Sequence, residues 1–155
     1  MPANAFDLFM AEHEPVGDLV AHANVVLWEK SALHPVIKER MRIRLAEAIG
    51  CSYCARFRTD LAGERILGDD ESAFSAEEQR KATIAEHFAV ESYTGSVTDE
   101  LTAETQEAFT PAEFTDLVFS IGWFIGMQHV GRLMHWDQAC PVAPIRRLVE
   151  AGEAA

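Results

Sequence analysis

The spacing of apolar residues is the feature that most restricts the fold of this 155-residue chain. Apolar residues recur at intervals of three and four through most of the sequence, and no segment alternates in the way that is typical of strands. The length fits one domain, in which folding buries roughly 70% of the surface that the unfolded chain exposes. We therefore predict a single all-α domain, a helical bundle, over residues 1–155.

Capping sequences locate three helices in the second half of the chain. They predict one helix from 75 to about 90, a shorter one from 98 to about 109, and a third from 110 to about 134. The break between the first two falls at Gly95 and Ser96. The cap signals are Ser75 with Glu78, Thr98, and Thr110 with Pro111 and Glu113.

Two further helices are predicted before a pair of cysteines. The first runs from Asp18 to about Lys30, and the second opens at Pro35 and stops at Gly50. Cys51 and Cys54 then lie at the first turn of another helix, which extends to about residues 62–63. With a spacing of three, both sulfur atoms share one face of that helix.

A glutamate lies on an apolar stripe of the helix that opens at Pro35. A carboxylate in such a place is either paired or has a raised pKa, because burial disfavours its charged form. Glu39 therefore either forms a salt bridge with Arg42 or Arg58, or relays protons, and the two roles are compatible.

The two thiols are the strongest candidates for chemistry. Unpaired N–H groups at a helix start favour thiolate, so we expect cysteine pKa values below the ordinary value of about 8.5. Arg58 follows Cys54 by four residues and would stabilise its thiolate further, although it cannot accept a proton. A vicinal dithiol with a lowered pKa and a proton relay is what redox chemistry requires.

A metal site is not predicted. Structural zinc takes four ligands, and no second close pair of cysteines or histidines accompanies Cys51 and Cys54. His129 and His135 lie on different sides of one helix, and Cys140 stands alone. These residues and His87 are interpreted as core or surface residues, so no metal or other cofactor is expected.

Charge and hydropathy restrict the partners and the compartment. Lys and Arg total 13 against 25 Asp and Glu, a net charge of -12, which repels a nucleic acid backbone. The N-terminus lacks the features of a signal peptide, so we expect the protein to lie in the reducing cytoplasm.

The apolar run Leu117–Met127 is too short to cross a membrane and is predicted to be a core helix. Within it, Gly122 and Gly126 are predicted to allow close helix packing.

The segment from Glu39 to Cys54, which contains Gly50-Cys51-Ser52-Tyr53-Cys54, resembles the alkylhydroperoxidase D-like proteins of the carboxymuconolactone decarboxylase superfamily. The likeness covers roughly residues 20–135 and is most specific in the Glu-x11-Cys-x-x-Cys arrangement. It implies an all-helical oligomer, trimeric or hexameric, with a peroxiredoxin-type antioxidant activity. Its two cysteines would cycle between dithiol and disulfide, with a protein or lipoyl-type reductant.

One position departs from this resemblance. In members that act as peroxidases, the glutamate matching Glu39 and a histidine four residues after the second cysteine form a proton relay, and here that position holds Arg58. The glutamate and both cysteines carry over, whereas the relay loses the group whose pKa lies nearest neutral pH. The helix-start argument favours Cys51 as the attacking thiolate, while the family scheme and Arg58 favour Cys54.

Three functions follow, of which the first is favoured. It is a thiol-disulfide enzyme that reduces peroxides or partner disulfides. The second is an enzyme of the same fold that acts on a small organic acid or lactone by acid-base chemistry through Glu39. The third is a non-catalytic oligomeric binding protein. Aromatic-rich helices, such as the one with Trp123 and Phe124, favour a homo-oligomer.

Overall fold

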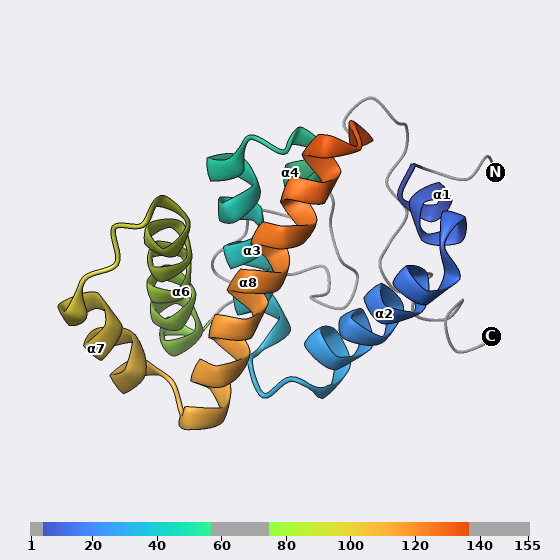
Figure 1. Cartoon of the computed structure of the whole chain (residues 1–155). Helices are drawn as coiled ribbons and strands as arrows, with labels where there is room; N and C mark the ends of the chain where they lie inside the picture. Colours follow the sequence, from blue (N-terminus) through green and yellow to red (C-terminus); the bar gives the residue numbers. More distant parts are fainter. Residues whose placement is uncertain (1–4, 57–74, 137–155) are drawn as a thin grey trace.

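The computed structural model describes residues 5–56 and 75–136, and within these ranges the chain is helical and forms no strand (Figure 1). This agrees with the predicted all-α class. The helical elements are α1 (Ala5–Glu12), α2 (Glu14–Val25), the π-helix η1 (Val26–Lys30), α3 (Pro35–Ile49), α4 (Ser52–Arg56), α6 (Ala76–Thr94), α7 (Asp99–Ala108) and α8 (Pro111–Leu133).

The predicted helix starts in the second half of the chain are confirmed by their caps. Ser75 and Glu78 form a reciprocal capping box at α6, and Thr110 and Glu113 form another at α8. The hydroxyl of Thr98 accepts a hydrogen bond from the N–H of Leu101 at the start of α7. Each cap satisfies backbone donors that a helix start leaves unpaired, so these boundaries follow from local chemistry.

The first part of the chain departs from the prediction. In place of one helix from Asp18 to Lys30, α2 begins at Glu14 and gives way to η1 at Val26. The helix α1 precedes them and was not predicted. The π-helical turn arises where Leu27 and Trp28 are both buried, which shows that packing rather than local propensity decides the backbone there.

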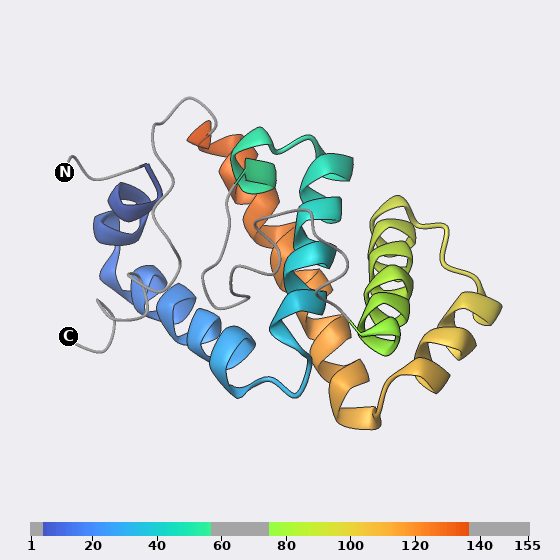
Figure 2. The ribbon, with the colours of Figure 1, turned by 180° about the vertical axis from the view of Figure 1, so that it is seen from behind.

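The helix α3 is the centre of the fold. It packs most extensively against α6 and α8, and α4 follows it directly at one end (Figures 1 and 2). Seen from behind, α3 lies between α8 and α6, with α1 and α2 at the opposite side of the molecule from α7. The fully buried side chains of α3 include Ile37, Met41 and Leu45, so its wide predicted apolar face forms the core.

A carboxylate of α8 fixes the segment that leads into α3. Asp116 accepts hydrogen bonds from the hydroxyl of Ser31, at 3.0 Å, and from the backbone N–H of Ala32. The segment between η1 and α3 is therefore attached to α8, a helix more than 80 residues later in the chain.

The two glycines of α8 are not explained by packing within the chain. A Cβ atom placed on Gly122 or Gly126 would meet nothing within 4 Å. The close helix packing predicted for these glycines is therefore not found among the described residues of the chain. They lie on the outer face of α8 beside Val118 and Phe119, whose side chains are 47% and 56% exposed.

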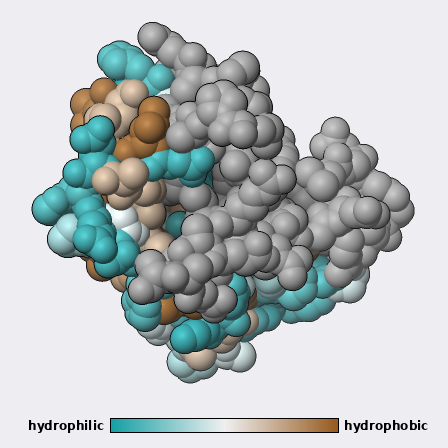
Figure 3. Space-filling model, turned by 90° about the vertical axis from the view of Figure 1, so that its right-hand side faces the viewer, coloured by the Kyte–Doolittle hydropathy of each residue, from teal (hydrophilic) through white to brown (hydrophobic). Residues whose placement is uncertain are grey.

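Other large hydrophobic side chains are also exposed in the described ranges. Figure 3 shows the molecule from the right-hand side of Figure 1. On this face hydrophobic residues, in brown, lie among hydrophilic ones, in teal, and are most evident toward the upper left. No helix in the described part of the chain combines the length and apolar character required to cross a membrane. The exposed residues are Leu8, Val16, Leu19, Val26, Val97, Val118, Phe119, Leu133 and Met134.

Candidate functional site

The turn between α3 and α4 places the two thiols side by side. Gly50 adopts a left-handed conformation, with φ at +79°, and ends α3, and the N–H of Cys51 then bonds to the carbonyl of Ala46 at 2.9 Å. This helix-ending motif fixes the backbone of Cys51. The N–H of Cys54 donates to the Cys51 sulfur at 3.3 Å, and both cysteines are free thiols.

The thiol pair is buried, and burial and hydrogen bonding raise the pKa of Cys54. Cys51 is 3% exposed and Cys54 is 8% exposed. A hydrogen bond with the Cys51 side chain, together with burial and the charge of Cys51, raises the pKa of Cys54 well above its usual range, although Arg42 opposes this shift. The prediction of a lowered pKa is thus wrong for Cys54, because its sulfur is desolvated and bonded to a second thiol.

A buried salt bridge supports the thiol turn. The Arg42 guanidinium donates to Glu39 from Nε at 2.8 Å and from Nη2 at 2.9 Å. Its Nη1 donates to the backbone carbonyl of Cys54 at 2.6 Å. The structure therefore confirms that Glu39 pairs with Arg42, and it shows that this pair contacts the backbone of the thiol turn. Arg42 itself is buried, at 5% exposed.

Two polar side chains of α8 complete the attachment of α3. Gln128 donates through Nε2 to the carbonyl of Arg42 at 2.9 Å, and Arg132 donates through Nη1 to the carbonyl of Ile49 at 3.0 Å. Sequence reasoning missed both residues. The only sequence signal for Gln128 is its place on the buried stripe of α8, three residues before the buried Gly131.

Aromatic residues gather near Cys51. The ring of Trp136 lies 5.8 Å from that of Tyr53 and 5.6 Å from that of Phe9, measured between centroids. A Cβ atom placed on Gly131 would lie 2.8 Å from Trp136 and 3.5 Å from the Cys51 sulfur. Gly131 thus allows the indole ring to approach the thiol. Burial, with the nearby thiols, raises the pKa of Tyr53 to about 12.

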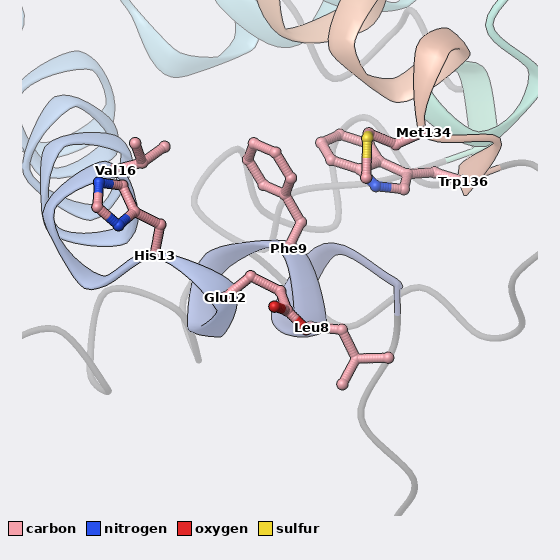
Figure 4. A pocket seen from close by; sticks show the side chains of 7 residues that line it. All are labelled: Leu8, Phe9, Glu12, His13, Val16, Met134 and Trp136. Carbon is pink, nitrogen blue, oxygen red and sulfur yellow. The ribbon is translucent and has the colours of Figure 1, made fainter.

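A pocket opens on the other side of this aromatic group. Its volume is about 590 Å³, and it lies between α1, the start of α2 and the end of α8 (Figure 4). Phe9 and Trp136 belong both to the pocket wall and to the aromatic group beside the thiols. The described residues that line it are Leu8, Phe9, Glu12, His13, Val16, Met134 and Trp136.

A buried lysine next to Glu39 was also missed by sequence reasoning. The side chain of Lys38 is fully buried, donates to the carbonyl of Leu27, and lies 5.4 Å from the centroid of the Trp28 ring. Burial lowers its pKa to about 8, although the charge of Asp116 acts in the opposite direction. Lys38 faces the π-helix η1, whereas Glu39 faces the thiol turn through Arg42.

The remaining candidate residues do not join this site. Arg58 and Cys140 lie outside the described residues. His87 lies on the surface of α6 beside Glu91, and His129 is exposed on α8 with its ring 6.0 Å from that of Tyr93. Within the described ranges, no three His, Cys, Asp or Glu side chains come together in a way that could hold a metal ion.

The site thus combines two adjacent thiols, a fixed salt bridge and an aromatic wall that separates one thiol from a pocket. Two neighbouring free thiols can cycle between a dithiol and a disulfide. Comparison of the chain with protein-family models, curated proteins and solved structures finds no match.

Proposed function

We propose that this chain is a thiol-disulfide oxidoreductase of the alkylhydroperoxidase D-like type, which reduces hydroperoxides or partner disulfides. The observation that carries the proposal is the arrangement of two free thiols at the α3–α4 turn, where the backbone N–H of Cys54 donates to the Cys51 sulfur. A second support is the salt bridge of Glu39 with Arg42, which fixes the carbonyl of Cys54. Glu39, Cys51 and Cys54 are the residues on which the resemblance to that family depends.

The protonation of the pair favours Cys51 as the attacking sulfur. Because the pKa of Cys54 is raised by its bond with Cys51, Cys54 keeps its proton when the first thiolate forms. The Cys51 sulfur also accepts the N–H of Cys54, which stabilises negative charge on it. This reverses the preference for Cys54 that Arg58 and the family scheme gave.

The reaction then needs no histidine. Cys51 gives its proton to water, and its thiolate attacks the terminal oxygen of the hydroperoxide, so that the O–O bond breaks and a sulfenic acid forms. The departing alkoxide takes the proton of Cys54 and leaves as the alcohol. The Cys54 thiolate attacks the Cys51 sulfur, and the released hydroxide takes up a proton to give water. An external dithiol reduces the resulting disulfide.

In this scheme the salt bridge between Glu39 and Arg42 positions the thiol turn and transfers no proton. Arg42 engages both carboxylate oxygens of Glu39, so the carboxylate holds the guanidinium against the Cys54 carbonyl instead of exchanging protons with substrate. An acid-base enzyme that works through Glu39 fits this arrangement less well. Activity retained in a Cys51→Ser/Cys54→Ser variant would select that alternative.

The test follows thiols during one turnover. Reduced protein with the Cys140→Ser background change is mixed with one equivalent of hydroperoxide, and peptide mapping identifies the products. We expect loss of two thiols and a Cys51–Cys54 disulfide. Cys54→Ser should stop at a Cys51 sulfenic acid, which dimedone traps, and Cys51→Ser should react at least a hundredfold more slowly. Thiol loss without the internal disulfide would contradict the proposal.

We further propose that the protein works as a homo-oligomer in the reducing cytoplasm. The exposed Val118 and Phe119 beside two glycines give α8 an outer face onto which a second helix could pack closely. A reducing compartment would regenerate the dithiol after each turnover. The substrate is a small peroxide or a partner disulfide, and the reductant a protein or lipoyl-type dithiol.

A further inference from the structure

We propose that the pocket between α1, the start of α2 and the end of α8 is a binding site for an uncharged, largely apolar organic molecule with an aromatic body. In this site Trp136 forms the wall between the bound molecule and Cys51. The inference goes beyond the proposed redox function, because binding in the pocket does not require reactive thiols.

The size and lining of the pocket indicate the class of ligand. A volume of about 590 Å³ falls within the range that holds small organic molecules. Phe9 lies between Val16 on one side and Met134 and Trp136 on the other, and the space they border is apolar (Figure 4). The rings of Phe9 and Trp136 favour a ligand with a flat aromatic ring. Such a ring can stack on the face of one side chain and meet the edge of the other.

The charged side chains among the described lining residues disfavour binding of a carboxylate ligand. Glu12 is the only charged side chain among the described residues that line it, apart from the titratable His13. No lysine or arginine of the described lining could pair with an anion, and the whole chain carries a net charge of -12. An anionic ligand would therefore lose hydration without gaining a cationic partner from the described lining residues. His13 instead offers a hydrogen bond to a hydroxyl group at the rim.

The aromatic group connects the pocket to the thiols. Trp136 contacts Phe9 on the pocket side and Tyr53 on the thiol side, and both its ring and the Cys51 sulfur lie close to Gly131. A ligand packed on Trp136 would hold the indole ring in place. Access of reagents to Cys51 through this wall should therefore fall when the pocket is filled.

The experiment compares two probes that differ in charge. The reduced full-length protein is titrated by calorimetry with 1-naphthalenemethanol and, separately, with 1-naphthoate, and the Cys51→Ser/Cys54→Ser variant is titrated in the same way. We expect saturable binding of one alcohol molecule per chain, binding of the carboxylate at least tenfold weaker, and unchanged affinity in the double variant. The thiol variant makes the result independent of any redox activity.

A matched pair of variants places the probe in the pocket. Val16→Trp fills the space from α2 and should weaken binding of the alcohol at least tenfold. Leu19→Trp adds the same side chain one turn later on α2, at a position outside the lining, and should change affinity less than twofold. Circular dichroism spectra and urea midpoints equal to those of the wild type establish that both variants fold.

A kinetic measurement tests the role of Trp136 as a wall. The rate of Cys51 alkylation by iodoacetamide, followed by peptide mapping, should fall at least threefold when the alcohol saturates the wild-type protein and stay unchanged in Val16→Trp. Absence of saturable binding, equal affinity for the carboxylate, or equal effects of the two tryptophan substitutions would each overturn the proposal. An unchanged alkylation rate at saturation would overturn the role of Trp136.

Discussion

Arg42 binds both carboxylate oxygens of Glu39 and, with its remaining terminal nitrogen, the backbone carbonyl of Cys54. The pair is buried, with Glu39 fully inaccessible to solvent. A planar guanidinium can make these three contacts at once, whereas a lysine ammonium cannot reproduce the parallel pair. The shape of the thiol turn therefore depends on an ion pair buried inside α3.

Glu39→Gln should lower the free energy of unfolding by about 3–5 kcal/mol, because it leaves the charge of Arg42 buried without a counter-ion. The control is Glu47→Gln, which removes the partner of Arg44 in an exposed pair of the same spacing on the same helix. That change should cost less than about 1 kcal/mol. Urea denaturation under reducing conditions measures both. Equal losses would show that the buried pair does not hold the turn.

Gly131→Ala should destabilise the protein by about 1–3 kcal/mol, because the new methyl group would lie 2.8 Å from the Trp136 ring. Gly126→Ala on the same helix meets nothing within 4 Å and should stabilise the subunit by up to about 1 kcal/mol through helix propensity. Thermal unfolding compares the two variants, with the sign of each change as the readout. Stabilisation by Gly131→Ala would contradict the close approach of Trp136 to α8.

Lys38 should make stability rise with pH above neutrality. Its folded pKa of about 8 lies below the ordinary value of 10.5, so between these values the unfolded chain binds more protons than the folded one. The stabilising contribution is present above the unfolded pKa and is lost as pH falls through about 8. The difference in unfolding free energy between wild type and Lys38→Met should therefore grow by about 1–3 kcal/mol from pH 7 to 10.

This comparison cancels the other titrating groups, including Tyr53, since both proteins contain them. Lys30→Met, which changes an exposed lysine on η1, serves as the control and should give a difference from wild type that is nearly constant with pH. Urea denaturation at intervals of half a pH unit provides the data. A flat difference for Lys38→Met would mean that the amine is solvated in the folded protein.

The raised pKa of Cys54 predicts slow, strongly pH-dependent alkylation. The rate constant of Cys54 should keep increasing from pH 9 to 10, where an unstructured thiol with a pKa of about 8.5 approaches its plateau. Iodoacetamide labelling followed by peptide mapping gives the rate at each cysteine, and a short peptide containing one cysteine supplies the reference. A plateau near pH 7 for Cys54 would instead support the thiolate that its helix position alone suggested.

The outer face of α8 is expected to hold the proposed oligomer together. Phe119→Asp should reduce the mass measured by light scattering toward the 17.2 kDa of one chain, because it places a charge in the apolar contact. Leu133→Asp introduces the same charge at the 78% exposed end of that helix and should leave the mass unchanged. A wild-type mass of one chain would remove the expectation of an oligomer.

Features of the fold that depend on neighbouring residues were predictable from the sequence. The capping boxes at Ser75 and Thr110 gave the starts of α6 and α8, and Gly95 gave the end of α6, although that helix continues to Thr94 rather than Val90. The stop at Gly50 also follows from local chemistry, since its left-handed conformation suits glycine. The positions of both thiols after this stop were predicted for the same reason.

Features that depend on distant contacts were not predictable in this way. The Trp28 ring of the π-helical turn lies beside Phe124 of α8 and under the buried Lys38 amine, and no local pattern in residues 26–38 reports these contacts. The pKa of Cys54 was predicted in the wrong direction because the helix-start argument contains neither burial nor the second sulfur. The wall formed by Trp136 joins residues more than 80 positions apart in sequence.

The hydrogen bond from Arg132 to the carbonyl of Ile49 has a consequence for biosynthesis. The donor follows the acceptor by 83 residues, so a ribosome completes most of the chain before the last turn of α3 can be stabilised by this contact. Until then the nascent thiol turn lacks one of its native constraints, so Cys51 and Cys54 reach their native arrangement only after α8 has docked.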